Sequence, residues 1–202
     1  MSLRKLALTL RRGASLDLPI RVESDVISYA AITGMTASAP LRVTAPSHGV
    51  PDGWRACVQN AGGMANLNVT DPVRDADLRR VAKIDANTLT FPGVNAAAWH
   101  AWTSGGQIAF YAPFDLSAYA SARMDVKDAA GGSELGQYST SASTLQIDLT
   151  NNAIWLHLSP VDTLLLPAGV HLFDIELVKE SGSVDAICSP DSTLTVIDEI
   201  TT

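Results

Sequence analysis

The chain has 202 residues, of which 47% are hydrophobic and 17% charged, a composition typical of globular domains and not of a disordered chain. Its apolar runs are short and broken by polar residues, so no segment approaches the roughly 20 apolar residues of a membrane-spanning helix. The formal net charge of −7 arises in residues 107–202, which carry 13 acidic and three basic side chains. This excess disfavours binding to a phosphate backbone, so we expect neither nucleic-acid binding nor a membrane span.

The first 31 residues predict two strands. Residues 6–11 and 15–23 both alternate apolar and polar side chains with a period of two, and Gly13 between them suits a turn or a bulge. Pro19 cannot donate a hydrogen bond to a neighbouring strand. We therefore expect the second strand to lie at the edge of a sheet or to bend there.

Residues 32–106 predict a second module inserted into the first. Glycine, alanine and asparagine become more frequent there, and the strand-like runs become shorter. The flexible pairs Thr33-Gly34 and Gly105-Gly106 bracket this segment, and insertions are tolerated at exposed turns whose ends lie close together. We expect one discontinuous domain from residues 1–31 plus 107–202, and an inserted module from residues 32–106.

After residue 107 the alternating pattern returns. The pair Asn151-Asn152 favours a hairpin because asparagine tolerates positive φ. The best helical pattern spans residues 159–166, where Ser159 can cap the helix and Pro160 can occupy its first position. Many short strands with frequent turns predict an all-β fold, a sandwich or a barrel. The five strand-like runs are 122–126, 145–149, 153–158, 170–178 and 192–197.

The two cysteines predict a reducing compartment. Cys57 and Cys188 are too far apart in sequence to form a CxxC pair or a disulfide framework, so we expect both to be buried and reduced, as in a cytoplasm. The basic N-terminus is not followed by an apolar run with a cleavage site, so we expect no signal peptide.

No motif predicts catalysis or a cofactor. The four histidines lack metal-ligand spacing, and His157 and His171 occupy polar positions of strands, where we expect them to face solvent. No glycine cluster matches a phosphate-binding loop and no serine sits in a GxSxG turn. We therefore predict no catalytic, cofactor-binding or metal-binding residue. The carboxylates after residue 107 leave a β-sandwich hydrolase of surface polymers as an alternative, although a solvated acidic face accounts for them as well.

Tryptophans supply the candidate contact residues. Trp54 and Trp155 lie in strand-like runs and are expected in cores. Trp99 and Trp102, near the end of the insert, are the candidate contact surface, because aromatic anchors are enriched at interfaces. A core position is the alternative for this pair. Stacking on a sugar ring would make the chain a carbohydrate-binding or receptor-binding module, which is an alternative function.

Three segments outside the insert resemble a known family. Residues 8–20, 114–127 and 166–177 are similar, in this order, to the strands of the immunoglobulin-like N-terminal domain of phage upper-baseplate proteins. The family's Thr-Gly pair is replaced here by Ser117-Ala118. The resemblance implies an immunoglobulin-like β-sandwich over residues 1–31 and 107–202.

The insert resembles a second module. His48-Gly49, Gly63-Met64 and Leu67-Asn68 match the most specific positions of a small β-barrel named after the first catalytic-cysteine half-domain (FCCH) of ubiquitin-activating enzymes, which recurs in tailed-phage tail proteins. The expected Gly-Asp after His-Gly is replaced by Asp52-Gly53-Trp54. The resemblance implies an inserted FCCH-like β-barrel with a structural role and without ubiquitin chemistry.

Together the two resemblances imply a tailed-phage protein. They predict a structural, non-enzymatic component of the tail tip or baseplate that joins the tail to fibre or receptor-binding proteins. Its partners would be other tail, baseplate or fibre proteins, bound by several copies in a symmetric assembly. Its location would be the virion, after assembly in the host cytoplasm.

Overall fold

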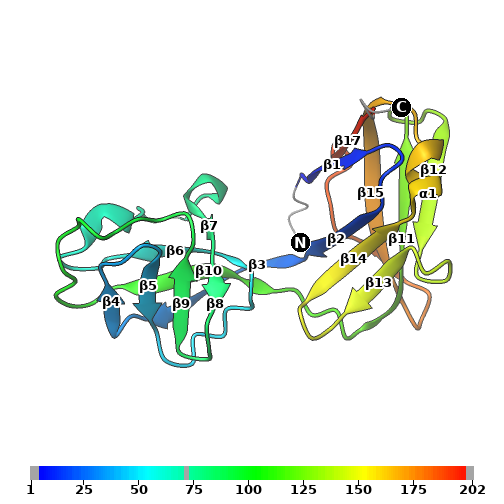
Figure 1. The fold of residues 1–202 in the computed structure, drawn as a ribbon. Coiled ribbons are helices and arrows are strands. Elements are labelled where there is room, and N and C mark those ends of the chain that lie inside the picture. The colour runs from blue at the N-terminus through cyan, green and yellow to red at the C-terminus, as the bar shows by residue number, and fades with distance from the viewer. Residues whose placement is uncertain (1–4, 71–72, 199–202) are drawn as a thin grey trace. The chain divides into compact units, whose positions relative to one another are not determined.

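The computed structural model describes residues 5–70 and 73–198, and within them nearly all of the regular secondary structure is β-strand (Figure 1). The all-β prediction is confirmed. Backbone contacts divide the chain into two compact units, which we name the sandwich unit (residues up to 22 and from 114 onward) and the insert unit (residues 23–113).

The boundaries of these units differ from the predicted junctions at residues 31 and 107. The strands β3 (Glu23–Ala31) and β10 (Gln107–Pro113) pair with each other, from Ala31 opposite Gln107 to Glu23 opposite Pro113. Because two strands of one ladder share their hydrogen bonds, both belong to the insert unit over their whole length. The sequence placed the junctions at the flexible pairs Thr33-Gly34 and Gly105-Gly106, which follow β3 and precede β10, so both strands fell to the flanking domain.

The sandwich unit consists of two sheets packed face to face. Its core draws on both, with Ile20 and Leu156 from the smaller sheet and Met124 and Ile175 from the larger one. β1 pairs in parallel with β17, and the other ladders are antiparallel. The larger sheet has the order β1 (Ala7–Arg11), β17 (Thr193–Ile197), β15 (Gly169–Lys179), β11 (Tyr119–Lys127) and β12 (Glu134–Ser139), with β16 (Val184–Ala186) also on β15, and the smaller sheet has the order β13 (Leu145–Asp148), β14 (Ala153–Leu158) and β2 (Leu16–Arg21).

The alternation of β14 decides which side chains enter this core. Ile154, Leu156 and Leu158 are buried, whereas Trp155 and His157 lie on the opposite face and are partly exposed. The prediction that Trp155 lies in the core was wrong. Side chains two residues apart on a strand share a face, so Trp155 lies on the same outer face as His157. The prediction for His171 was also wrong: it is 7% exposed and its Nε2 lies 2.8 Å from the carbonyl oxygen of Pro167.

The insert unit contains two four-stranded sheets. Its core combines Leu41 and Phe91 from one sheet with Val58 and Ile108 from the other, and Trp54 is fully buried there, as predicted. Two 3-10 turns, η1 (Ala65–Leu67) and η2 (Asp75–Asp77), complete the unit. The sheets have the orders β3, β10, β6 (Arg55–Gln59), β7 (Arg79–Arg80) and β4 (Gly34–Thr36), β5 (Leu41–Thr44), β9 (Thr88–Phe91), β8 (Ala82–Lys83).

The predicted closed barrel is corrected by this topology. Among the described residues no ladder joins the two sheets of the insert unit. Instead the chain passes from one sheet to the other between β7 and β8, at the buried Val81, and again between β3 and β4. Corners made by strands that switch sheets are typical of two-layer packing. Short strands of this kind occur both in closed barrels and in two stacked sheets. The sequence alone therefore did not distinguish a barrel from two layers.

Both cysteines are buried and free, as predicted. Burial raises the pKa of the Cys57 thiol to about 11 and also raises that of Cys188. Their thiols are therefore protonated at neutral pH, which suits packing rather than nucleophilic chemistry.

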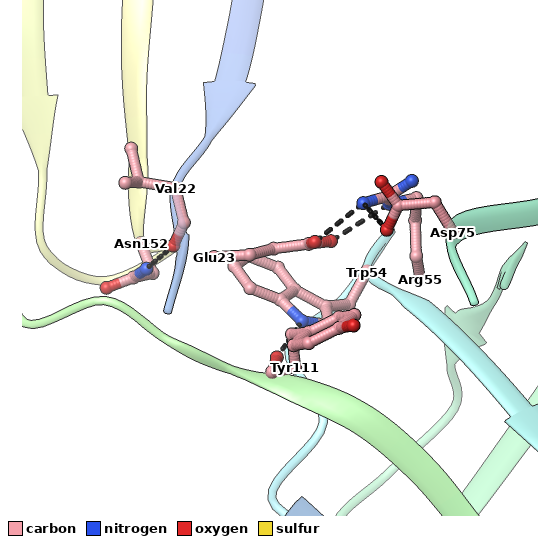
Figure 2. A network of polar contacts seen from close by, with 7 residues as sticks. All are labelled: Val22, Glu23, Trp54, Arg55, Asp75, Tyr111 and Asn152. Carbon is pink, nitrogen blue, oxygen red and sulfur yellow. Dashed lines mark hydrogen bonds and ion pairs between the residues drawn. The ribbon is translucent and has the colours of Figure 1, made fainter. Parts of the chain in front are cut away.

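A half-buried ion pair ties β3 to β6 within the insert unit (Figure 2). The guanidinium of Arg55 donates from Nε and one terminal nitrogen to the two carboxylate oxygens of Glu23, at 2.9 and 2.6 Å. The Glu23 side chain is only 7% exposed. In the same unit Trp54 Nε1 donates to the carbonyl of Tyr111, and in the sandwich unit the Asn152 amide donates to the carbonyl of Val22. These contacts give the Glu23 carboxylate, the Trp54 indole N–H and the Asn152 amide their partners.

Replacing Arg55 by leucine should destabilise the insert unit by roughly 1–3 kcal/mol, because the buried Glu23 carboxylate loses its bidentate partner. Urea unfolding followed by tryptophan fluorescence measures this. The control Arg42→Leu removes an exposed charge from β5 and should change stability by less than about 0.5 kcal/mol. The double variant Glu23→Leu/Arg55→Leu should be more stable than Arg55→Leu, and equal losses in both arginine variants would contradict this account.

Candidate functional site

Trp99 and Trp102, the predicted contact residues, lie together on a loop of the insert unit after β9. Both are partly buried and pack against the insert core. The indole nitrogen of Trp102 donates to the carbonyl of Gly105 at 3.0 Å. Each ring therefore contributes part of its surface to the core and leaves part accessible.

Glycines of the resemblance motif hold this tryptophan loop in place. Gly62 donates its N–H to the carbonyl of Ser104 and accepts from the N–H of Thr103. Gly63 has φ +77°, and a Cβ at this position would lie 2.2 Å from the carbonyl oxygen of Ala101. Only glycine lets the two backbone segments approach so closely. The glycine of the motif thus allows the close packing of two backbone segments.

His48, the other distinctive motif residue, is also structural. Its ring is buried, Nδ1 accepts from the N–H of Val50, and Nε2 lies 3.0 Å from the carbonyl of Asp85. Burial lowers the pKa of His48, so the ring is neutral at pH 7 with its proton on Nε2. Both ring nitrogens are engaged within the insert unit.

Two carboxylates of the acidic C-terminal half face each other in the sandwich unit. Asp125 on β11 is directly opposite Asp174 on β15, beside an open hollow of about 200 Å³ that Lys127 also lines. Burial, then the charges of Asp125 and Glu176, raise the pKa of Asp174. In residues 5–70 and 73–198 no three His, Cys, Asp or Glu side chains gather in a way that could hold a metal ion.

The exposed face of the helix α1 (Pro160–Leu165) is the feature that the sequence did not assign to a function. Val161, Leu164 and Leu165 are 66%, 52% and 74% exposed. Positions i, i+3 and i+4 lie on one face of a helix, so the three aliphatic side chains form a single apolar surface, which we name the α1 face. An amphipathic helix normally turns such a face toward the core.

Several contacts fix α1 with this face outward. Ser159 and Asp162 form a reciprocal capping box at its start. Thr163 and Leu166, both fully buried, occupy the opposite side of the helix, and the Thr163 hydroxyl donates to the carbonyl of Ala14. Rotating the α1 face inward would expose Leu166 and break the Thr163 bond.

Arg12 closes the other end of the helix. Its guanidinium donates to the carbonyl of Leu164 at 3.1 Å and to the carboxylate of Asp198 at 2.7 Å. The last helical carbonyls have no partner within a helix, so this contact satisfies one of them. It also links α1 to the end of β17, where Ile197 is 48% exposed.

The sequence predicted the helix and its cap but not its orientation. The spacing of Val161, Leu164 and Leu165 was the available signal. Leu166 continues the same apolar run, so the pattern alone did not indicate which leucines are buried.

The comparisons with known proteins add no family. No protein-family model matches the chain, and no curated protein matches it significantly. Among the described residues, no helix has the length and apolar character needed to cross a membrane.

Asp174→Asn should stabilise the sandwich unit at pH 7 by up to about 1 kcal/mol, the size of a like-charge repulsion across two strands. The raised pKa of Asp174 means that the folded protein disfavours the charged form of this carboxylate. The stabilisation by Asp174→Asn should therefore shrink as the pH falls through the raised pKa toward 3.8, the ordinary pKa of an aspartate. Thermal unfolding at pH 7 and near pH 4 measures it.

The matched control is Asp148→Asn. Hydrogen bonds, first from the side chain of Asn151, lower the pKa of Asp148, so its removal should destabilise the protein at pH 7. Equal effects of the two variants would contradict the conclusion that burial and the charge of Asp125 disfavour a charged Asp174.

Proposed function

We propose that this protein is a structural, non-enzymatic component of a phage tail tip or baseplate, which binds other tail or fibre proteins through the α1 face. The observation that carries the proposal is the outward orientation of Val161, Leu164 and Leu165 on a helix fixed at both ends. The two sequence resemblances support the location in a phage tail. The exposure of the α1 face supports the choice of binding surface.

The α1 face has the properties of a protein contact. Large apolar side chains gathered on one exposed surface mark interaction sites more often than scattered ones. Burial of a leucine side chain contributes about 1.5–3 kcal/mol. A partner that covers Leu164 and Leu165 therefore gains a substantial part of the free energy of binding. The helix cannot relieve the exposure by rotation, because Thr163 and Leu166 hold it.

The partner surface should be an apolar groove with few acidic groups. The sandwich unit carries most of the chain's negative charge, since residues 107–202 have 13 acidic and three basic side chains. A partner of opposite charge is favoured by electrostatic complementarity. Several copies in one particle would add weak individual contacts into a stable assembly.

Leu165→Lys should reduce the yield of infectious particles at least about tenfold when it replaces the wild-type chain in a complementation assay, because a charge then occupies the centre of the contact. A lysine in the last helical turn is compatible with the helix, so folding should be preserved. The matched control is Ile84→Lys, which alters a side chain of the insert unit that is 53% exposed.

Purified particles provide the second measurement. Mass spectrometry should detect the chain in wild-type particles and detect less of it with Leu165→Lys but not with Ile84→Lys. Absence of the chain from purified particles would refute the phage setting. Normal incorporation of Leu165→Lys would refute the role of the α1 face.

A further inference from the structure

The outer face of the smaller sheet of the sandwich unit carries a second surface, independent of α1. Trp155 and His157 point away from the core on β14, and their rings are parallel within 5°, with centroids 5.8 Å apart. Pro19 lies opposite Trp155 on β2, and Gln146 lies opposite it on β13. We name this surface, formed by Trp155, His157, Pro19, Gln146, Asp17 and Asp148, the β14 face.

Carboxylates hold both rings in position. Trp155 Nε1 donates to Asp148 Oδ2 at 3.2 Å, and His157 Nδ1 lies 2.6 Å from Asp17 Oδ1. Asp148 in turn accepts from the side-chain amide of Asn151 at 2.7 Å. A ring fixed before the ligand arrives loses little conformational freedom on binding, so the β14 face is preorganised.

An open hollow adjoins the His157 ring. It has a volume of about 480 Å³ and shares His157 and Gln146 with the β14 face. Leu145, Ile147 and Leu149 give it an apolar wall, and Thr140 and Ser143 add hydroxyl groups. Sites for small molecules have this volume and this combination of apolar walls with a few polar groups.

We propose that the β14 face and this hollow bind a neutral saccharide. A pyranose ring has an apolar face of C–H groups, which suits an aromatic ring, and a rim of hydroxyl donors. The Asp17 carboxylate and the Gln146 amide oxygen supply acceptors for such donors, whereas Asp148 is occupied by N–H groups of Thr150, Asn151 and Trp155. The negative charge of Asp17 and Asp148 disfavours acidic sugars and phosphates. This site differs from the tryptophan pair of the insert unit, and it does not depend on the α1 contact.

The test uses the full chain labelled with ¹⁵N, which contains four tryptophans and therefore four indole N–H signals. Neutral tetrasaccharides of glucose, N-acetylglucosamine, galactose and mannose are added separately, up to about 10 mM, a range that detects weak binding. We expect at least one of them to shift the indole signal of Trp155, which Trp155→Ala identifies by its disappearance. The signals of Trp99 and Trp102 should stay in place and serve as internal controls.

Variants then separate stacking from indirect effects. Trp155→Ala should weaken binding, followed through the backbone signals around Gln146, at least about tenfold, and Trp155→Phe should retain part of it. Because Trp155 lies outside the core, unchanged backbone signals of sandwich-core residues such as Met124 and Ile175 report that the variant is folded. Leu165→Lys should bind the sugar as the wild type does.

Three results would overturn the saccharide site. They are the absence of any shift with all four sugars, binding that Trp155→Ala leaves unchanged, and shifts centred on Trp99 and Trp102. None of them bears on the incorporation of the chain into particles, so this proposal and the proposed function can fail separately.

Discussion

The period of two along β14 is the constraint on which the sandwich unit depends. Ile154, Leu156 and Leu158 must enter the core together, since a shift of the strand by one residue would exchange all of them for Trp155 and His157. The same constraint therefore builds the core and presents two aromatic rings on the outer face. Asp17 and Asp148 supply the hydrogen bonds that the ring nitrogens would otherwise seek from water.

The helix α1 follows β14 directly, and a different periodicity governs it. Its buried side has only Thr163 and Leu166, while three aliphatic side chains, Val161, Leu164 and Leu165, remain outside. Hydrogen bonds from Thr163 and Arg12 to backbone carbonyls keep this orientation at the cost of apolar exposure. An exposed apolar surface that the fold retains by specific polar contacts has the character of a binding surface, because solubility alone would favour its burial.

Alternation in the sequence was sufficient to predict the all-β class, Ser159 and Pro160 predicted the short helix, and the separation of Cys57 and Cys188 predicted two buried, reduced thiols. The unit boundaries were not predicted, because the flexible glycine pairs next to β3 and β10 set the expected junctions and only the mutual pairing of these strands assigns them to the insert. The outward face of α1 depends on which leucine packs inward, and the pair Asp125 and Asp174 depends on strand register. The outward orientation of Trp155 was predictable, since Trp155 is two residues from His157 on the same strand and His157 was expected to face solvent.

The α1 face and the β14 face depend on the same core for their stability, but different side chains form each of them. Leu158 ends β14 inside the core, and the next residue, Ser159, caps α1, so a loss of packing along β14 would disturb both surfaces. Side chains that point outward, such as Trp155 and Leu165, contribute little to that packing. Changes there alter what each surface can bind while the shared core persists. Substitutions on the two proposed surfaces should therefore act independently of each other.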